Sequence, residues 1–490
     1  MGIVIRQSIR NTVITYIGFG IGAINALILY PHFLGKELYG LTGFVLSAAN
    51  VIMPIMAFGV HNTLVKYFVQ YKTEEEKNGF LTYVVLLPLL LIIPLFLVVS
   101  IFYDPIALYF SSKNPGVYTY FWQIPIIGFC MGYFEIFYAW AKVHLESVFG
   151  NFVRELLLRV LISIGLTGVF LKWYDAAFFI NLTLLVYLIA TVAMMVYAFR
   201  VRPFRMDVTF PVNHKEVFTY SIFIILSGSI ANVLLDLDKT ILVKFVDAEY
   251  IAFYGVAIFI ATVISVPARA MQQITYPITA KLMAEGKHDE LNDLYKKSSI
   301  TLQVLGGLIF AGIVVNIRQL YLMMPPEYSA GLFSVFVVGL SKYIDLILGN
   351  NNAIIFNSHY YRAVLILGIL LTLIMVGLNL WLIPIMGIDG AAIATLISIG
   401  LYLLAKLLFV VLKMDLYPFT VRTLYSTGIL IVTILGFYFW EFPFHPILNI
   451  GLKSVLVTFF FMGAHYFLNV SSEVNGMLHL ALSLFKRRKS

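Results

Sequence analysis

The sequence predicts an all-α polytopic membrane protein with about fourteen transmembrane helices. Of its 490 residues, 61% are hydrophobic and only 12% are charged. Many apolar runs reach the roughly 20 residues that a helix needs to cross a ~30 Å hydrocarbon core. The run YVVLLPLLLIIPLFLVVSIF (83–102) is apolar on every side, whereas a surface helix of a soluble protein has a polar face. These runs also exclude a transmembrane β-barrel, whose strands alternate and are about ten residues long.

The spans are placed by hydropathy and by the turn residues and charges that separate them. We expect the N-terminal run to remain as the first span, because no small-residue cleavage site follows it. The expected boundaries are about 12–30, 41–65, 80–102, 118–141, 153–171, 177–199, 217–243, 250–280, 299–317, 331–356, 363–384, 390–412, 423–440 and 446–468.

The distribution of Lys and Arg predicts that both termini are cytoplasmic. An even number of spans places both ends on one side of the membrane, and we assign most of the 33 basic residues to that side. Cytoplasmic loops are enriched in Lys and Arg, which fixes the orientation. The tail KRRK (486–489) is expected to anchor this topology at anionic lipid. The residues assigned to the opposite side are Lys36, Lys113, Lys172, Lys244, Arg318 and Lys453.

An internal repeat divides the spans into two groups of six. Segments 33–54 and 245–267 each have an acidic residue, Glu37 or Glu249, shortly before a Tyr-Gly pair and then a long helix with a proline. Two further pairs follow in the same order, 150–160 with 358–368 and 173–179 with 387–394. We therefore expect an N-terminal lobe (1–205), a C-terminal lobe (206–415) and a final pair of helices with a basic tail (416–490). Because six is even, a pseudo-two-fold axis along the membrane normal would relate the lobes, with a cavity between them.

Three stretches resemble the multidrug/oligosaccharidyl-lipid/polysaccharide exporter superfamily. They are LGKELYGL after the first span, DKTILVKFVDAEYIAFYGVA in the middle, and IPIMGIDGAAIATLIS (383–398) near the twelfth span. By their order and spacing they are most similar to the polysaccharide transporters, the Wzx-type flippases of the bacterial inner membrane. The resemblance covers essentially the whole chain. It implies two lobes, fourteen helices and ion-coupled transport of a polyprenyl-pyrophosphate-linked oligosaccharide for cell-surface polysaccharide.

Three carboxylates within the spans are candidates for binding a coupling ion, either a proton or sodium. A charge at the centre of a spanning helix costs ~2.5–3.5 kcal/mol, so such a residue normally faces a cavity or a partner. Asp236 shares a helix face with Lys239, and Asp345 lies three residues from Lys342, so both could also be structural ion pairs. Glu135 is the third candidate. In some multidrug relatives carboxylates on spans 7 and 10 form the cation site, an arrangement that Asp236 and Asp345 resemble.

Cations and amides within or beside the spans are candidates for contacting a lipid-linked sugar diphosphate. Phosphate oxygens call for Arg and Lys, whereas sugar hydroxyls call for amide groups. Arg10 could equally serve only to set the topology. Candidates for phosphate are Arg10, Lys66, Arg269 and Lys342, and candidates for sugar are Gln272, Gln273 and Asn352.

The sequence has no motif of a soluble or membrane enzyme, but it leaves other transport functions open. We expect no enzyme activity, cofactor or metal site, because no Walker A loop or His-Glu-x-x-His motif is present. A membrane-embedded glycan polymerase is disfavoured by the short outer loops. A multidrug/cation antiporter of the same superfamily, or a lipid II flippase of the MurJ type, stays open as an alternative. The expected partners are the lipid-linked substrate, membrane lipid and glycan-assembly proteins such as a polymerase, with no nucleic acid.

Overall fold

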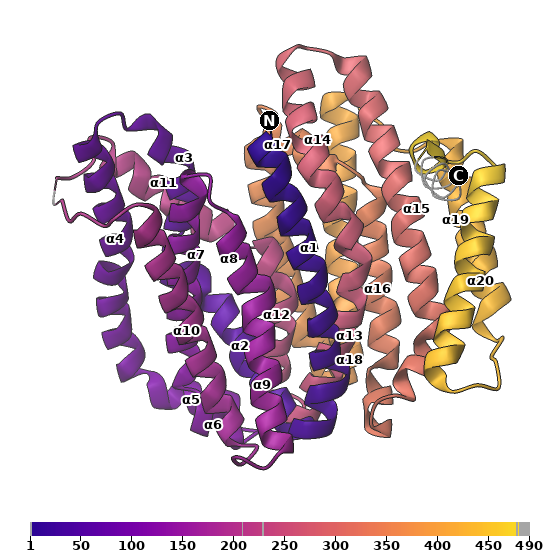
Figure 1. The fold of residues 1–490 in the computed structure, drawn as a ribbon, viewed down its shortest axis with the longest axis horizontal. Coiled ribbons are helices and arrows are strands. Elements are labelled where there is room, and N and C mark those ends of the chain that lie inside the picture. The colour runs from indigo at the N-terminus through magenta and orange to yellow at the C-terminus, as the bar shows by residue number, and fades with distance from the viewer. Residues whose placement is uncertain (1, 208, 228–229, 477–478, 480–490) are drawn as a thin grey trace, which may run out of the picture. The chain divides into compact units, whose positions relative to one another are not determined.

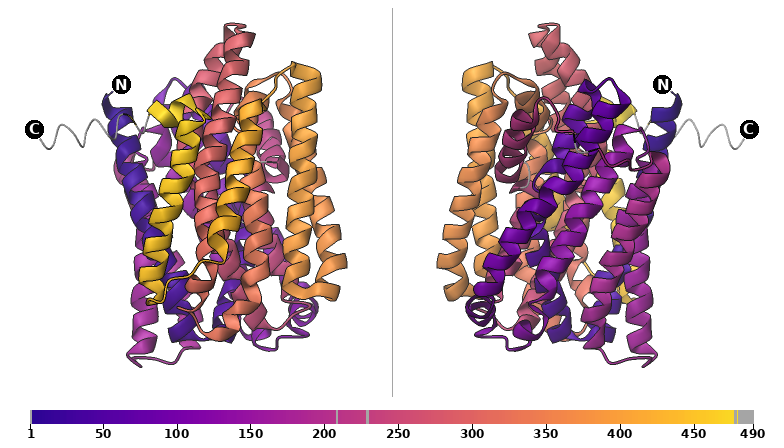
Figure 2. Two further views of the ribbon diagram at one scale, coloured as in Figure 1. Left: turned by 90° about the vertical axis from the view of Figure 1, so that its right-hand side faces the viewer. Right: turned by 90° about the vertical axis from the view of Figure 1, so that its left-hand side faces the viewer.

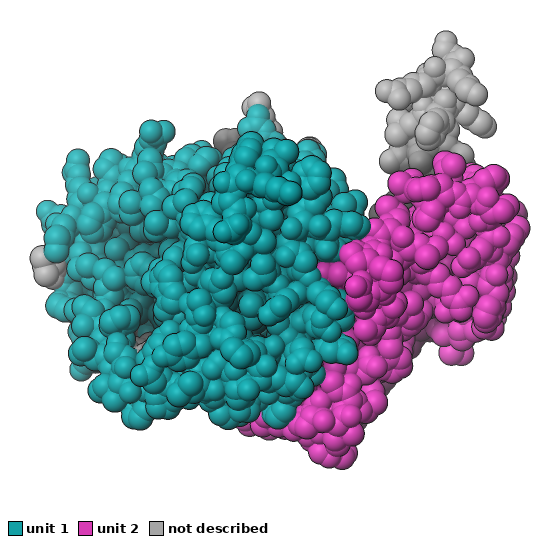
Figure 3. Space-filling model, turned by 90° about the horizontal axis from the view of Figure 1, so that it is seen from below, with its two compact units in different colours: residues 1–255 teal, residues 256–490 magenta. Residues whose placement is uncertain are grey.

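The computed structural model describes residues 2–207, 209–227, 230–476 and 479, and this part of the chain consists of helices joined by loops, with no strand (Figure 1). The all-α class is therefore confirmed. The basic tail 486–489 lies outside the described residues. The chain forms two compact units, residues 1–255 and 256–490, which are coloured separately in Figure 3.

Unit 1 contains the helices of the first six predicted spans and those of the seventh. Its long helices run roughly parallel to one another (Figure 1). The helices are α1 (Gly2–Ile24), α2 (Lys36–Met56), α3 (Val60–Tyr67), α4 (Glu74–Ile101), α5 (Tyr103–Ser111), α6 (Gly116–Tyr120), α7 (Gln123–Val143), α8 (Val148–Phe152), α9 (Leu158–Phe170), α10 (Phe178–Val201), α11 (His214–Ser227) and α12 (Ile230–Leu242), with π-helical segments η1 (Asn25–Leu34) and η3 (Val153–Leu157) and the 3-10 turn η2 (Phe68–Gln70). Helix α13 (Ala248–Thr262) begins in this unit and crosses its boundary.

Unit 2 is built around one long central helix, α15, against which α14, α16, α19 and α20 pack. Figure 2 shows these helices in its left view, in salmon to yellow. They are α14 (Val266–Ala284), α15 (His288–Tyr321), α16 (Leu332–Ile347), α17 (Asn351–Asn357), α18 (Tyr361–Met414), α19 (Val421–Tyr438) and α20 (Pro446–Phe467), with 3-10 turns η4 (Val263–Ser265) and η5 (Pro326–Gly331).

Eleven helical segments of the described chain are long and apolar enough to cross a membrane, so this is a multi-pass membrane protein. One of them, in α18, contains two predicted spans, which meet at Gly387 with φ 59° and ψ −132°. The predicted span 153–171 falls on the continuous run α8–η3–α9, and the span 217–243 falls on α11 and α12. All fourteen predicted spans thus lie on helices.

Two predicted spans are interrupted by glycines in left-handed conformation. The span 41–65 divides into α2 and α3 at Gly59, where φ is 63° and where the backbone of Ser221 leaves no room for a Cβ. The span 331–356 divides into α16 and α17 at Gly349, where φ is 55°. Hydropathy does not detect such breaks, because both sides of each break are apolar.

Contacts between helices do not follow the predicted lobes. Within unit 1, α12 packs along α2 and α11 packs against α3. These contacts group the seventh span with the first six, although the sequence repeat assigns it to the second lobe. The lobes 1–205 and 206–415 stay a prediction, because they rest on the repeat and not on contacts.

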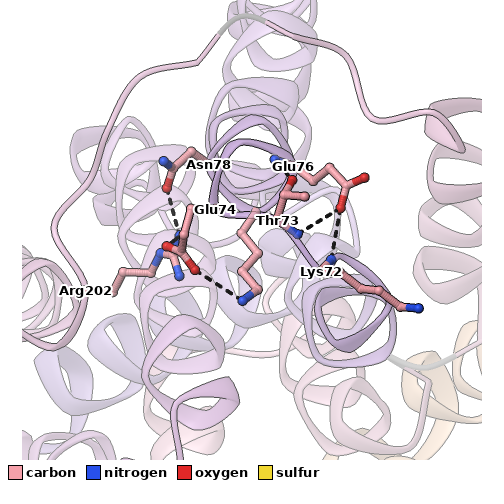
Figure 4. A network of polar contacts seen from close by, with 7 residues as sticks. Lys72, Thr73, Glu74, Glu76, Asn78 and Arg202 are labelled. Atoms are coloured by element: carbon pink, nitrogen blue, oxygen red, sulfur yellow. Dashed lines mark hydrogen bonds and ion pairs between the residues drawn. The ribbon is translucent and has the colours of Figure 1, made fainter.

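The start of α4 is capped by its own side chains and is bound to the end of α10. Thr73 and Glu76 form a reciprocal capping arrangement: the Glu76 carboxylate accepts from the Thr73 N–H at 3.1 Å, and the Thr73 hydroxyl accepts from the Glu76 N–H at 3.1 Å (Figure 4). Arg202, at the end of α10, donates to Glu74 at 2.8 Å and to Asn78 at 2.9 Å. These contacts tie the two helix ends together.

The starts of α2 and α13, which carry the two copies of the first repeat segment, pack directly on each other. Lys36 and Glu249 form an ion pair of 2.8 Å there. Gly40 lies so close that a Cβ on it would overlap the carbonyl oxygen of Ala248, whereas the nearest atom to a Cβ on Gly43 is 4.0 Å away.

We therefore expect Gly40→Ala to force the two helices apart. The free energy of unfolding should fall by about 1–3 kcal/mol, the usual cost of overpacking. Gly43→Ala, on the same helix, is the matched control and should leave the thermal midpoint of the purified protein near that of the parent. Equal midpoints for the two variants would contradict the close contact.

Candidate functional site

A network of four charged side chains lies within the membrane-spanning helices of unit 1. Arg154 Nη1 is 3.0 Å from Glu135 Oε1, and Arg154 Nε is 3.7 Å from Glu155 Oε1. Arg159 Nη2 is 3.0 Å from Glu155 Oε2. We call these four residues the intramembrane charge network. It joins α7, which carries Glu135, to the adjoining η3 and α9.

The backbone of η3 is held by the first helix. A Cβ on Gly18 of α1 would overlap the carbonyl of Glu155, and one on Gly22 would lie 3.2 Å from the side chain of Arg159. Gly18 and Gly22 of α1 therefore serve close helix packing, as small residues in membrane helices commonly do. Asn25 Nδ2 donates to the carbonyl oxygen of Arg159 at 2.9 Å, which extends the contact.

Further cations surround the network. The ring of Tyr138 lies 3.8 Å from Lys142 Nζ and 5.3 Å from Arg154 Cζ. Glu135 also interacts electrostatically with Lys142 and His61. Two carboxylates therefore face three basic side chains and a histidine. The Arg154 side chain is 42% exposed while Glu135 is 18% exposed, so a ligand can reach the guanidinium.

Asp236 lies in unit 1 and is held by three partners. Its carboxylate accepts hydrogen bonds from Ser47, at 2.9 Å, and from Asn50, both on α2. Lys239 Nζ lies 3.0 Å away, which makes the ion pair that the sequence left open as one of two readings. Tyr187 interacts electrostatically with both Asp236 and Arg159. Polar groups thus continue from the intramembrane charge network to Asp236.

Asp238, two residues further along α12, has a different environment. Its side chain is fully buried, and the hydroxyl of Tyr254 donates to it at 2.8 Å. Asp236 is 19% exposed. The opposite directions of the two side chains are those expected from the helical period.

The other two unit 1 candidates lie outside this network. Arg10 is exposed on α1, and Lys66 is exposed on α3 with its Nζ 3.7 Å from the ring centroid of Tyr220. Neither shows an ion pair among the described residues.

The remaining candidates lie in unit 2. Asp345 is exposed on α16 and interacts electrostatically with Lys406 of α18, a lysine that is 2% exposed. Lys342 and Asn352 are half-buried, while Arg269 and Gln272 are exposed. The side chain of Gln273 lies outside what the structure describes.

The asparagines before Asn352 tie helices together. Thr275 of α14 donates to the side-chain oxygen of Asn350 at 2.9 Å, and Asn351 donates to the hydroxyl of Tyr295 at 2.8 Å. Both asparagines are buried. Their geometry indicates a structural role, which leaves Asn352 as the sugar candidate in this segment.

Arg154, Glu155 and Arg159 are not among the sequence candidates, although all three lie in the predicted span 153–171. The helical run that carries them begins earlier, at Val148. The available signal was the spacing Arg-Glu-x-x-x-Arg, which places Glu155 and Arg159 one turn apart.

No group of three or more His, Cys, Asp or Glu side chains suited to a metal ion occurs among the residues that the structure describes. What the network offers chemically is anion binding. A guanidinium presents a planar fork that matches phosphate oxygens, and within a span it is little screened by water.

Comparisons with known proteins agree with this architecture. No family model matches the chain. A probable flippase, AglR of Haloferax volcanii, is 30% identical over 175 residues, which span 34% of this chain and 35% of that protein. The inward closed structure of the lipid II flippase MurJ matches with a TM-score of 0.73 at 14% identity, covering 94% of this chain and 99% of the other.

An inward-facing multidrug transporter of the MATE family matches with a TM-score of 0.59 at 16% identity, covering 80% of this chain and 98% of the other. That protein belongs to the multidrug/oligosaccharidyl-lipid/polysaccharide superfamily. The chain therefore has the fold that MurJ and this transporter share, as the sequence resemblance implied.

Proposed function

We propose that this protein is a flippase of that superfamily and that it moves a polyprenyl-pyrophosphate-linked oligosaccharide across the cytoplasmic membrane, with both termini in the cytoplasm. The single observation that carries the proposal is the intramembrane charge network. With Lys142 beside it, three basic side chains face two carboxylates and the Arg154 guanidinium is accessible, which suits a diphosphate and not the cationic cargo of a drug exporter. The likeness to MurJ and to the probable flippase AglR supports the same assignment.

Arg154 is the residue best placed to meet the diphosphate. Its guanidinium forms ion pairs with both Glu135 and Glu155. An arriving phosphate can replace Glu135 as its partner without leaving a buried cation unpaired, which limits the cost of desolvation. Lys142 and Tyr138 lie beside it for the second phosphate and the first sugar.

Transport against a gradient needs a coupling ion, for which we propose a proton or sodium bound at Asp236, Asp345 or Glu135. When phosphate replaces Glu135 as the partner of Arg154, the Glu135 carboxylate is left without its cation. It would then bind a proton or sodium, which couples substrate binding to ion binding. The proposal assigns no covalent chemistry and no cofactor to the chain. A polysaccharide polymerase or another glycan-assembly protein is the proposed partner.

Depletion of the protein in its native cell tests the proposal. We expect lipid-linked oligosaccharide to accumulate on the cytoplasmic face and surface glycan to fall, with recovery on re-expression. The accumulated lipid identifies the glycan, and lipid II in its place would assign the MurJ-type alternative. Unchanged surface glycan in a cell without a second flippase, together with new sensitivity to cationic drugs, would establish the antiporter alternative.

A further inference from the structure

A cavity of about 560 Å³ lies in unit 2, and none of the candidate site residues lines it. Four helix ends surround it: the end of α14, the start of α15, and the ends of α17 and α18. Its base is apolar, with Leu282, Leu291 and Leu416 buried and Met283 and Met414 partly buried. The cavity thus offers an apolar floor below several polar helix ends.

The side chains at its rim are basic. They are Lys287, His288, His359 and Lys413, and no acidic side chain is among the described residues that line the cavity. Lys287 is held by Glu285 at 3.2 Å and by Glu290 at 3.3 Å, so its charge is already compensated. Lys413 and His359 have no ion pair within the described part of the chain.

One contact closes the cavity on one side. His288, at the start of α15, lies with Nε2 2.8 Å from the carbonyl oxygen of Met414, at the end of α18. This ring can therefore share one nitrogen with the helix end and still line the cavity. The acidic Asp415 that follows is engaged by the hydroxyl of Tyr417 at 2.9 Å.

The cavity lies at the level of a membrane surface. Helix α18 ends beside it, and α19 crosses away and α20 returns, so the cavity is on the same side as the end of α20. Exposed Leu412, Tyr360 and Tyr417 flank it, at 75%, 45% and 46% exposure. Aromatic side chains at the end of a spanning helix are typical of the headgroup region.

We propose that this cavity binds the headgroup of an anionic phospholipid. The shared chemistry is a phosphate ester on an apolar body. The phosphate would lie between Lys413 and His359, with the glycerol and upper acyl chains over the leucines and methionines of the base. A bare phosphate ion would leave that base in contact with water. In the proposed orientation the cavity faces the leaflet that carries anionic lipid, and the assignment otherwise stands apart from the proposed function.

The lipid would act on unit 2 by holding helix ends together. Lys413 belongs to α18 and His359 to the segment after α17, while His288 joins α18 to α15. A ligand that binds only the folded arrangement raises its stability in proportion to its concentration over Kd. Binding should therefore be visible as thermal stabilisation of the full-length protein.

The test compares lipids that differ only in headgroup charge. The purified protein is titrated in detergent with phosphatidylglycerol, with phosphatidylcholine of the same acyl chains and with inorganic phosphate. Bound lipid is counted by native mass spectrometry and the thermal midpoint is recorded. We expect phosphatidylglycerol to bind and stabilise, with Lys413→Gln weakening its binding about fivefold and Lys413→Gln/His359→Gln weakening it further.

Lys297→Gln is the matched control. Lys297 is an exposed lysine near the start of α15 that is paired with Asp293 at 2.7 Å and does not line the cavity. Its replacement should leave lipid binding unchanged. Equal binding of both lipids, or equal effects of the two lysine variants, would overturn the proposal. A further outcome is that inorganic phosphate raises the thermal midpoint as much as phosphatidylglycerol does, with Lys413→Gln removing that effect. This result would assign the cavity to a soluble anion and overturn the lipid assignment.

Discussion

Arg154→Gln should lower the rate of lipid-linked oligosaccharide flipping by about ten- to a hundredfold in reconstituted vesicles. A hydrogen bond to a charged group contributes ~1.5–3 kcal/mol, and the forked geometry of arginine is what a diphosphate would use. Arg154→Lys keeps the charge without the fork and should retain part of the activity. The measurement is the initial rate at which a labelled lipid-linked substrate becomes accessible on the opposite leaflet.

A structural role for Arg154 predicts a different pattern, because removing it leaves the carboxylate of Glu135 without its nearest cation. The double variant Glu135→Gln/Arg154→Gln separates the two roles. If the pair only stabilises the fold, the double variant should recover both the thermal midpoint and transport. If Arg154 binds substrate, the midpoint should recover while transport stays below that of Glu135→Gln alone. Arg202→Gln, which breaks the exposed pair with Glu74, should leave transport unchanged.

The class of fold and the placement of the helices were predictable because they depend on apolar length. The polar face of α7 was also predictable, since Glu135, Tyr138 and Lys142 recur at helical spacing and do lie together around Arg154. The breaks at Gly59 and Gly349 were not, because a left-handed glycine within apolar sequence has no hydropathy signal.

The partners of the charged residues were the least predictable part. For Asp236 the sequence offered a coupling-ion site or an ion pair with Lys239, but not its contacts with Ser47 and Asn50 of α2, because pairing between distant helices is not encoded in the spacing within either one. Lys406 lies in the predicted span 390–412 but is not among the sequence candidates, and the structure buries it within α18. A long amphipathic side chain can enter a span where one acidic neighbour, here Asp345, compensates it.

Substitutions at Asp236 and Asp238 should affect different properties of the protein: the first should affect ion-dependent transport and the second stability. Asp236→Asn keeps an acceptor for Ser47 and loses a partly exposed ion pair with Lys239. Its new amide nitrogen can donate to Asn50 once the Asn50 amide turns its oxygen inward, so the free energy of unfolding should change by about 1 kcal/mol. If Asp236 binds the coupling ion, however, transport should lose its dependence on the imposed proton or sodium gradient and fall at least about tenfold. Asp345→Asn tests the second carboxylate in the same assay.

Asp238→Ala should lower stability and leave the ion dependence of transport unchanged. It removes the buried carboxylate that accepts from the Tyr254 hydroxyl, and a hydrogen bond to a charged group contributes ~1.5–3 kcal/mol, so the thermal midpoint should fall. Transport per folded molecule should keep its ion dependence. Tyr254→Phe should lower the midpoint less in the Asp238→Ala background than in the parent, because the shared hydrogen bond is already absent there. A gradient-dependent rate in Asp236→Asn together with a lost dependence in Asp238→Ala would reverse the two roles, and would place the coupling site on the buried side of α12.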